Sequence, residues 1–96
     1  MASEFPTPAN ADQAAEQEVI AFNQNTVTEA DFESLCKGFY MYTTQSVHVA
    51  FDEAANSGSF LLTNAMGFVS FDQITATRVS ALGDSTTGNL YIIGRR

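Results

Sequence analysis

The feature that most restricts how this chain folds is a two-residue alternation of apolar and polar side chains, which begins after residue 34. In the segment VHVAF, residues 47–51, the two valines and the phenylalanine fall on one face, and His48 and Ala50 fall on the other. Side chains of a β-strand alternate between two faces, whereas the face of a helix repeats every three or four residues. The alternation therefore predicts β-strands in this part of the chain.

Short alternating segments follow one another at spacings of about eight to twelve residues, and turn-forming residues separate them. The segment GFYMYT places Phe39 and Met41 on one face and Tyr40 and Tyr42 on the other. Near the end of the chain, GDSTTGN (83–89) separates two apolar segments, which predicts a β-hairpin. The series is typical of an all-β sandwich or a small barrel, and we favour a small antiparallel β-sandwich or jelly-roll-like domain.

Residues 1–18 have a different composition. They contain Pro6, Pro8 and a polar, alanine-rich stretch, and they lack an alternating apolar segment. We expect an extended N-terminal arm over residues 1–18 and a single β-sandwich domain over residues 19–96. The chain has one cysteine, Cys36, so it cannot form an internal disulfide. Because a small core provides limited stability, we expect oligomerisation or docking to add to it.

The formal net charge of −7 is distributed unevenly along the chain. Residues 1–35 hold seven acidic residues and no Lys or Arg, whereas residues 72–96 hold three arginines and two aspartates. Nucleic-acid binding requires clustered cations that neutralise phosphates, so this distribution argues against a nucleic-acid partner. The acidic end is either a solvated tail or an arm that contacts the basic end of a neighbouring copy.

No membrane-spanning or secretory segment is evident in the sequence. No apolar run approaches the ~20 residues that a membrane-spanning helix needs. The opening MASEFPTPANADQ lacks the basic and apolar regions of a secretory signal. We therefore expect a protein that is made in a cytoplasm and has no membrane partner.

Candidate catalytic and metal-binding residues are few and dispersed. Cys36 and His48 lack the neighbouring base, carboxylate or paired ligand spacing of a nucleophilic or metal site. FDEAANSG (51–58) has oxygen donors without the spacing of a calcium loop, and GDSTTGN lacks the lysine and helix of a phosphate-binding loop. We interpret Cys36 as a small buried apolar residue and His48 as a surface or interface residue. We expect no enzyme activity, cofactor or metal ion.

Tyrosines are the remaining candidate contact residues. Tyr40 and Tyr42 lie in one expected strand, and Tyr91 lies in another strand far along the chain. Exposed tyrosines on a sandwich face can stack on sugars, and the same amphipathic rings fill cores and protein interfaces. We favour the core or a protein interface. The residues that we expect in protein contacts are Glu4, Phe5, Glu16, Glu18, Tyr40, Tyr42, Arg78, Arg95 and Arg96.

Three stretches of residues 36–93 share a recognisable order of elements. An aromatic strand, a short turn and a valine-rich strand (CKGFYMYTTQSVHVAF) are followed by SFLL and then by ITATRVSALGDSTTGNLYII. These stretches resemble small β-rich structural proteins of tailed bacteriophages, of the head decoration, cement or spike-base type.

The resemblance implies a non-enzymatic virion protein. Its expected partners are the major capsid protein and further copies of itself, as a homo-oligomer or as many copies on one capsid. Its expected location is the capsid surface, after synthesis in the host cytoplasm. The alternative is a glycan-binding or host-recognition module of a virion spike or fibre.

Overall fold

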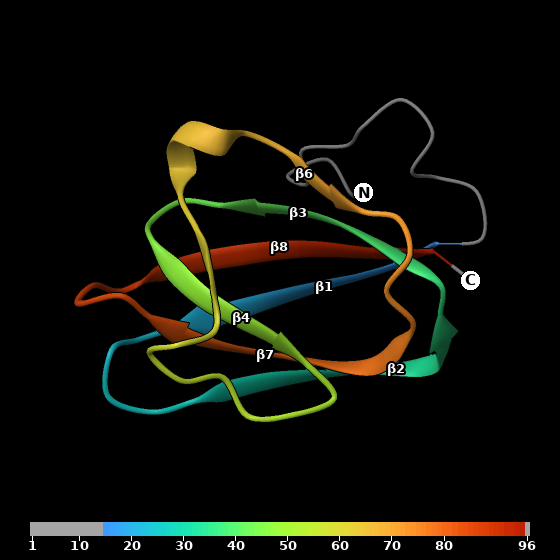
Figure 1. Ribbon diagram of the computed structural model, residues 1–96, viewed down its shortest axis with the longest axis horizontal. Coiled ribbons are helices and arrows are strands. Elements are labelled where there is room, and N and C mark those ends of the chain that lie inside the picture. Colours follow the sequence, from blue (N-terminus) through green and yellow to red (C-terminus); the bar gives the residue numbers. More distant parts are fainter. Residues whose placement is uncertain (1–14, 96) are drawn as a thin grey trace.

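The computed structural model describes residues 15–95, which form eight β-strands and one short 3₁₀ turn (Figure 1). Sheet 1 contains, in order across the sheet, β1 (Ala15–Phe22), β8 (Gly88–Arg95), β3 (Gly38–Thr43) and β6 (Val69–Phe71). Sheet 2 contains β2 (Thr28–Cys36), β7 (Ala76–Gly83), β4 (Val47–Phe51) and β5 (Phe60–Leu62). The turn η1 (Asn64–Met66) joins β5 to β6. The predicted all-β fold is confirmed.

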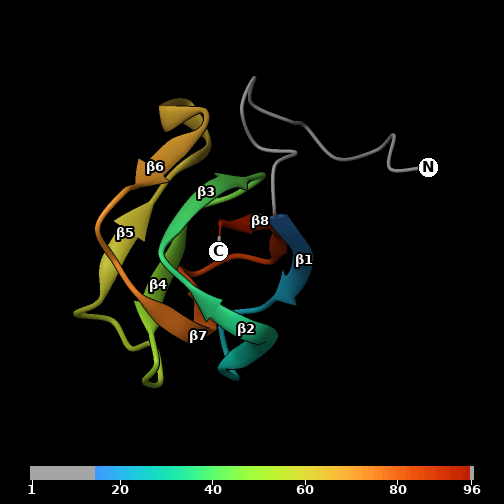
Figure 2. The same ribbon diagram turned by 90° about the vertical axis from the view of Figure 1, so that its right-hand side faces the viewer.

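The strand pairs are nested about the middle of the chain. β4 pairs with β5, β3 with β6, β2 with β7 and β1 with β8, and every pair is antiparallel. This nesting is that of one long hairpin, and rolling up such a hairpin produces the two sheets of a jelly roll. Figure 2 shows the strands of both sheets around a shared interior. The sandwich is therefore an eight-stranded jelly roll.

The prediction that GDSTTGN closes a β-hairpin is wrong. β7 pairs with β2 and β4 in sheet 2, whereas β8 pairs with β1 and β3 in sheet 1. The loop between them crosses from one sheet to the other, as does each connection between strands of residues 15–95 except the one from β4 to β5. Gly83 donates its N–H to the carbonyl oxygen of Asn23 (2.8 Å) and Asp84 donates to that of Ser46 (3.0 Å). The loop thus ties together one end of the sandwich.

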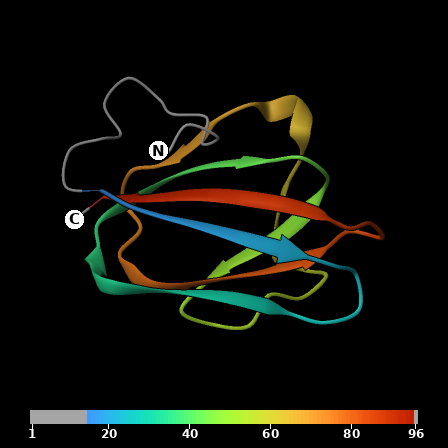
Figure 3. The same cartoon turned by 180° about the vertical axis from the view of Figure 1, so that it is seen from behind.

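The first strand begins at Ala15, inside the segment that we expected to form the arm (1–18). β1 and β8 run side by side in Figure 3, and their register extends from Ala15 opposite Arg95 to Phe22 opposite Gly88. The backbone of β8 supplies hydrogen bonds even where the side chains of β1 are polar, so composition did not reveal the start of the strand. Residues 1–14, including Glu4 and Phe5, lie outside the described residues, as does Arg96.

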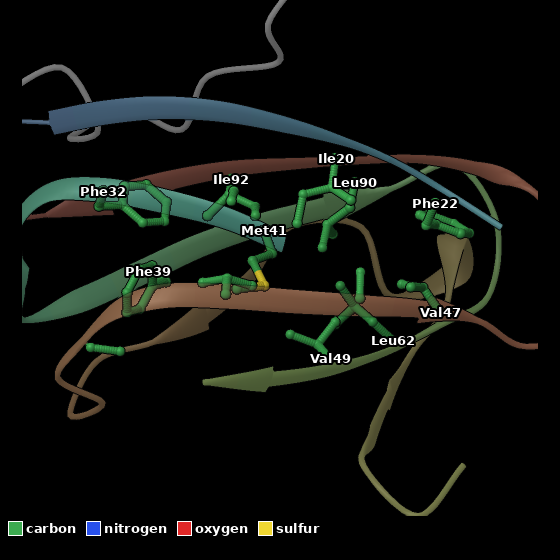
Figure 4. Close-up of a cluster of buried hydrophobic side chains, with 14 of the residues drawn as sticks. Ile20, Phe22, Phe32, Phe39, Met41, Val47, Val49, Leu62, Leu90 and Ile92 are labelled. Atoms are coloured by element: carbon green, nitrogen blue, oxygen red, sulfur yellow. The ribbon is translucent and has the colours of Figure 1, made fainter. Parts of the chain in front are cut away.

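Alternate residues of each strand point between the sheets and form the core. Ile20 and Leu90 from sheet 1 meet Val49 and Leu62 from sheet 2 in Figure 4, and all four side chains are buried. Each such side chain contributes about 1.5–3 kcal/mol by leaving water. The predicted burial of Cys36 is confirmed. The faces that alternation assigned to Phe39 and Met41 and to Val47 and Val49 are the inward ones. The last four are among the residues with at most 2% exposure.

The two sides of the sandwich differ. On one side, the edge strands β1 and β2 approach each other, and the N–H of Glu33 donates to Oε1 of Glu16 (3.1 Å). On the other side, β5 pairs with β4 alone and β6 pairs with β3 alone. The edges of β5 and β6 therefore stay open to further pairing within the part of the chain that the structure describes.

Candidate functional site

The outward face of sheet 2 is covered by the chain itself. The loop after β4 folds back over this face, where Ser80 Oγ donates to the carbonyl oxygen of Glu53 and Ala55 is buried. Oδ1 of Asp52 accepts hydrogen bonds from the backbone N–H groups of Thr77 and Arg78 (both 3.0 Å). The carboxylate of Asp52, one of the oxygen donors in FDEAANSG, therefore holds the loop against β7.

His48, which we expected at the surface or in an interface, is buried within the chain on this covered face, where it is 8% exposed, so that expectation is wrong. Its Nδ1 lies 3.1 Å from the carbonyl oxygen of Ser59, and its Nε2 lies 3.2 Å from Oδ1 of Asp84. Cys36 lies on the opposite side of sheet 2, in the core, where the Cβ that Gly94 lacks would be 2.6 Å from its Sγ. The fold thus separates the histidine from the cysteine.

Metal binding finds no support in the geometry of the described residues. Residues 15–95 contain no group of three or more His, Cys, Asp or Glu side chains that could hold a metal ion. Four carboxylates do gather where β1 meets β2, those of Glu16, Glu18, Asp31 and Glu33. Partial burial raises the pKa of Glu18, and the other three carboxylates raise it further by repulsion. The repulsion within this cluster therefore destabilises the folded chain.

The outward face of sheet 1 carries a row of apolar and aromatic side chains that crosses β1, β8 and β3 and ends directly before β6. Val19 of β1 lies opposite Tyr91 of β8, and Tyr91 lies opposite Tyr42 of β3. The ring centroids of Tyr91 and Tyr42 are 6.3 Å apart, and Phe68, directly before β6, lies 5.7 Å from Tyr42. We call Val19, Tyr91, Tyr42 and Phe68 the aromatic row.

The aromatic row is partly open to solvent and has a polar group at its rim. Val19 is 47% exposed and Phe68 is 38% exposed, while the two tyrosines are half-buried. Nδ2 of Asn64, in η1, donates to the hydroxyl of Tyr42 (3.1 Å) and to the carbonyl oxygen of Thr43 (3.0 Å). These bonds fix the ring of Tyr42 and leave an oriented amide beside it.

Two tyrosines of the expected contact set lie on this face. Tyr40 and Tyr42 were expected contact residues, and both point outward from sheet 1, where Tyr40 lies opposite Ile93. Tyr91 comes from a distant part of the chain, and the register of β8 with β3 brings it beside Tyr42. Val19 and Phe68 were not expected there. Alternation could have placed both side chains on the outward face of their segments. Only the order of the strands in sheet 1 shows that they lie beside the tyrosines.

The arginines that we expected in contacts do not form one site. Arg78, in sheet 2, places Nε 3.8 Å from Oε2 of Glu29 in the neighbouring strand. Arg95, in sheet 1, pairs with Ala15, and its guanidinium group lies over Gly38. Contact between the acidic and basic ends of neighbouring copies was one of our two expectations; within residues 15–95, Glu16 and Glu18 of β1 and Arg95 of β8 lie on adjacent strands of one chain.

Comparisons with protein-family models, with curated proteins and with solved structures found no match. In residues 15–95 no helix has the length and apolar character needed to cross a membrane. Function is therefore inferred from the fold and from the chemistry of its surfaces.

Proposed function

We propose that this chain is a non-enzymatic structural protein of a tailed bacteriophage, which docks in many copies on the assembled capsid and stabilises it. The aromatic row carries this proposal. Val19 and Phe68 of this row are 47% and 38% exposed on the outward face of sheet 1, whereas a loop of the chain covers the outward face of sheet 2. The docking surface is accordingly the outward face of sheet 1, and the partner is the major capsid protein.

The chemistry of the aromatic row suits a protein interface. Its four members carry no charge, and interface centres are depleted of charge and enriched in aromatic residues. Tyrosine provides a large contact area with few rotatable bonds, so ordering it on binding costs little entropy. Jelly rolls also occur in viral capsid proteins and in lectins, an analogy of fold that agrees with the proposal without specifying it.

The experiment is co-sedimentation of the purified protein with capsids of its source phage from which the native copies have been stripped. Wild-type protein should saturate the capsids at many copies each and raise their resistance to heat. Tyr42→Ala with Tyr91→Ala should weaken binding at least about thirtyfold, the effect of losing one 2 kcal/mol hot spot. Phe60→Ala removes a more exposed aromatic ring away from the row and should bind like wild type.

Other results would count against the proposal. Saturation at a few copies per particle would assign the protein to a vertex, tail or fibre base. Absence of binding by a folded wild-type protein would refute capsid docking. Equal weakening by Phe60→Ala would show that the aromatic row is not the docking surface.

A glycan-binding function is the second candidate, and the rim of the aromatic row favours it. The rings of Tyr42 and Tyr91 lie next to each other, and the Asn64 amide beside them offers a hydrogen-bonding group for a sugar hydroxyl. It predicts that sugars quench tyrosine fluorescence and that Tyr91→Ala abolishes the quenching. A wild-type protein that responds to no member of a broad sugar panel would exclude this function while leaving capsid docking intact.

A further inference from the structure

The open side of the sandwich, where β5 and β6 are the edge strands, contains an apolar groove that neither proposed function involves. It lies between the edges of the two sheets, has a volume of about 480 Å³, and is flanked by β5 and by the end of β6. Its apolar lining comes from both sheets and from the segment before β7: Val49, Ala50, Phe51, Phe60, Phe71 and Ile74.

Aromatic rings connect this groove directly to the core. The centroids of Phe39 and Phe51 are 5.1 Å apart, those of Phe51 and Phe71 are 5.3 Å apart, and those of Phe71 and Phe60 are 5.5 Å apart. Phe39 is 1% exposed, whereas Phe60 at the other end is 50% exposed. A core that continues to the surface as aromatic rings is unfavourable in water, so a covering segment would stabilise it.

We propose that this groove receives residues 1–14 of the same molecule, with Phe5 as the anchoring side chain. Phe5 is the one aromatic residue among these fourteen. It precedes Pro6, and a residue before proline is disfavoured in the helical region, so this part of the chain favours extended conformations. An extended segment is the shape that a groove between two sheet edges accepts.

The position of β1 allows the segment to reach the groove. Ala15 lies opposite Arg95, which lies opposite Gly38, and the next residue of β3 lies opposite Phe71. The segment therefore joins the domain at the same end of sheet 1 as Phe71. Three strand spacings separate β1 from β6, about 14 Å.

Phe5 lies ten positions before Ala15, and an extended stretch of that length spans about 33 Å. Tethering makes docking within one molecule effectively unimolecular, which favours it over docking on a second copy. The backbone edges of β5 and β6 face the groove side and provide hydrogen-bonding groups for the segment.

The test is disulfide trapping in the full chain under mild oxidation. One protein carries Thr7→Cys with Thr75→Cys, which places a thiol at the groove because Thr75 lines it. The matched protein carries Thr7→Cys with Glu33→Cys, an exposed position beside the start of β1. Glu33 is nearer the attachment of the segment, so an undocked segment would react there at least as fast. Thr7→Cys alone measures any reaction with the buried Cys36.

We expect the intramolecular disulfide to form about tenfold faster at position 75 than at position 33. Adding Phe5→Ala should remove that preference, while circular dichroism shows an unchanged β domain. Equal rates at the two positions would overturn the proposal, and so would a preference that survives Phe5→Ala. Mainly intermolecular disulfides, increasing with protein concentration, would also overturn it by assigning the groove to the segment of a second copy.

Discussion

Gly94 provides a sharp test of the packing between the sheets. It lies on the inward face of β8, and a Cβ at this position would lie 2.6 Å from Sγ of Cys36. The same Cβ would lie 3.2 Å and 3.3 Å from two ring carbons of Phe32. Favourable contacts between carbon atoms lie near 3.5–4.0 Å, so the sulfur is the severe obstacle and the ring needs to move only by tenths of an ångström.

Gly94→Ala should therefore destabilise the fold by about 1–3 kcal/mol, the usual cost of an extra methyl group in a packed core. For a domain of this size the melting temperature should fall by about 4–24 °C. Cys36→Ala alone should cost about 0.5–1.5 kcal/mol, as does removal of a methyl-sized group from a core. In the double variant the new methyl group occupies the space of the missing sulfur, so the double variant should be more stable than Gly94→Ala alone.

The assay is urea unfolding followed by far-ultraviolet circular dichroism, with a reducing agent present because Cys36 is the one thiol. Four proteins complete the cycle: wild type, the two single variants and the double variant. Additive effects within about 0.5 kcal/mol would refute the reasoning, since independent sites behave that way. A Gly94→Ala protein as stable as wild type would refute the close approach itself.

Three further predictions concern single positions. Protonated Glu18 stabilises the fold fully below its ordinary pKa of 4.5 and loses this effect as the pH rises through the raised pKa of the folded state. Glu18→Gln should therefore increase stability at pH 7 by about 0.2–1 kcal/mol, a gain that disappears near pH 4 in urea titrations; a gain that persists there contradicts it. Gly83→Ala should lower stability by about 3 kcal/mol in thermal unfolding, because its Cβ would overlap the carbonyl oxygen of Thr86. Gly58→Ala is the mild control, because its Cβ would lie 3.2 Å from one side-chain amide oxygen, that of Asn56. Asp52→Ala should lower the free energy of unfolding by about 1–3 kcal/mol, because two backbone N–H groups of β7 lose their acceptor. Asp52→Asn keeps an oxygen there and tolerates the positive φ of 57°, so it should cost less. Equal losses of stability in the two variants would contradict that role.

The sequence predicted which face of a strand each side chain occupies better than which strand lies beside it. Alternation correctly placed Phe39 and Tyr42 on opposite faces of one strand, because the period of two is a local property of extended backbone. The loop GDSTTGN looked like a hairpin because turn-forming residues flanked by apolar strands are common to hairpins and to connections between sheets. Strand order is set by pairing of distant segments, and no local pattern encodes it.

For the candidate surface, too, the sequence predicted the face of a side chain better than its neighbours on adjacent strands. That Tyr40 and Tyr42 point outward could be predicted from one strand. The proximity of Tyr91 and Val19 depends on the register of β8 with both β3 and β1, which joins the two ends of the domain. The start of β1 was missed because Glu16 and Glu18 give it the composition of a solvated segment, although its backbone pairs fully with β8.

The nested pairing also affects how the protein is made. Phe22 ends β1 and pairs with Gly88, which begins β8, so the first strand synthesised must wait for the last. At about 5–20 residues per second, roughly 3–13 s pass between translation of these two residues. During that time Ile20 and Phe22 have no sheet partner in β8 and are available to other exposed apolar chains. The yield of folded protein in a cell should consequently depend on translation speed and chaperone supply, even in variants whose equilibrium stability is unchanged.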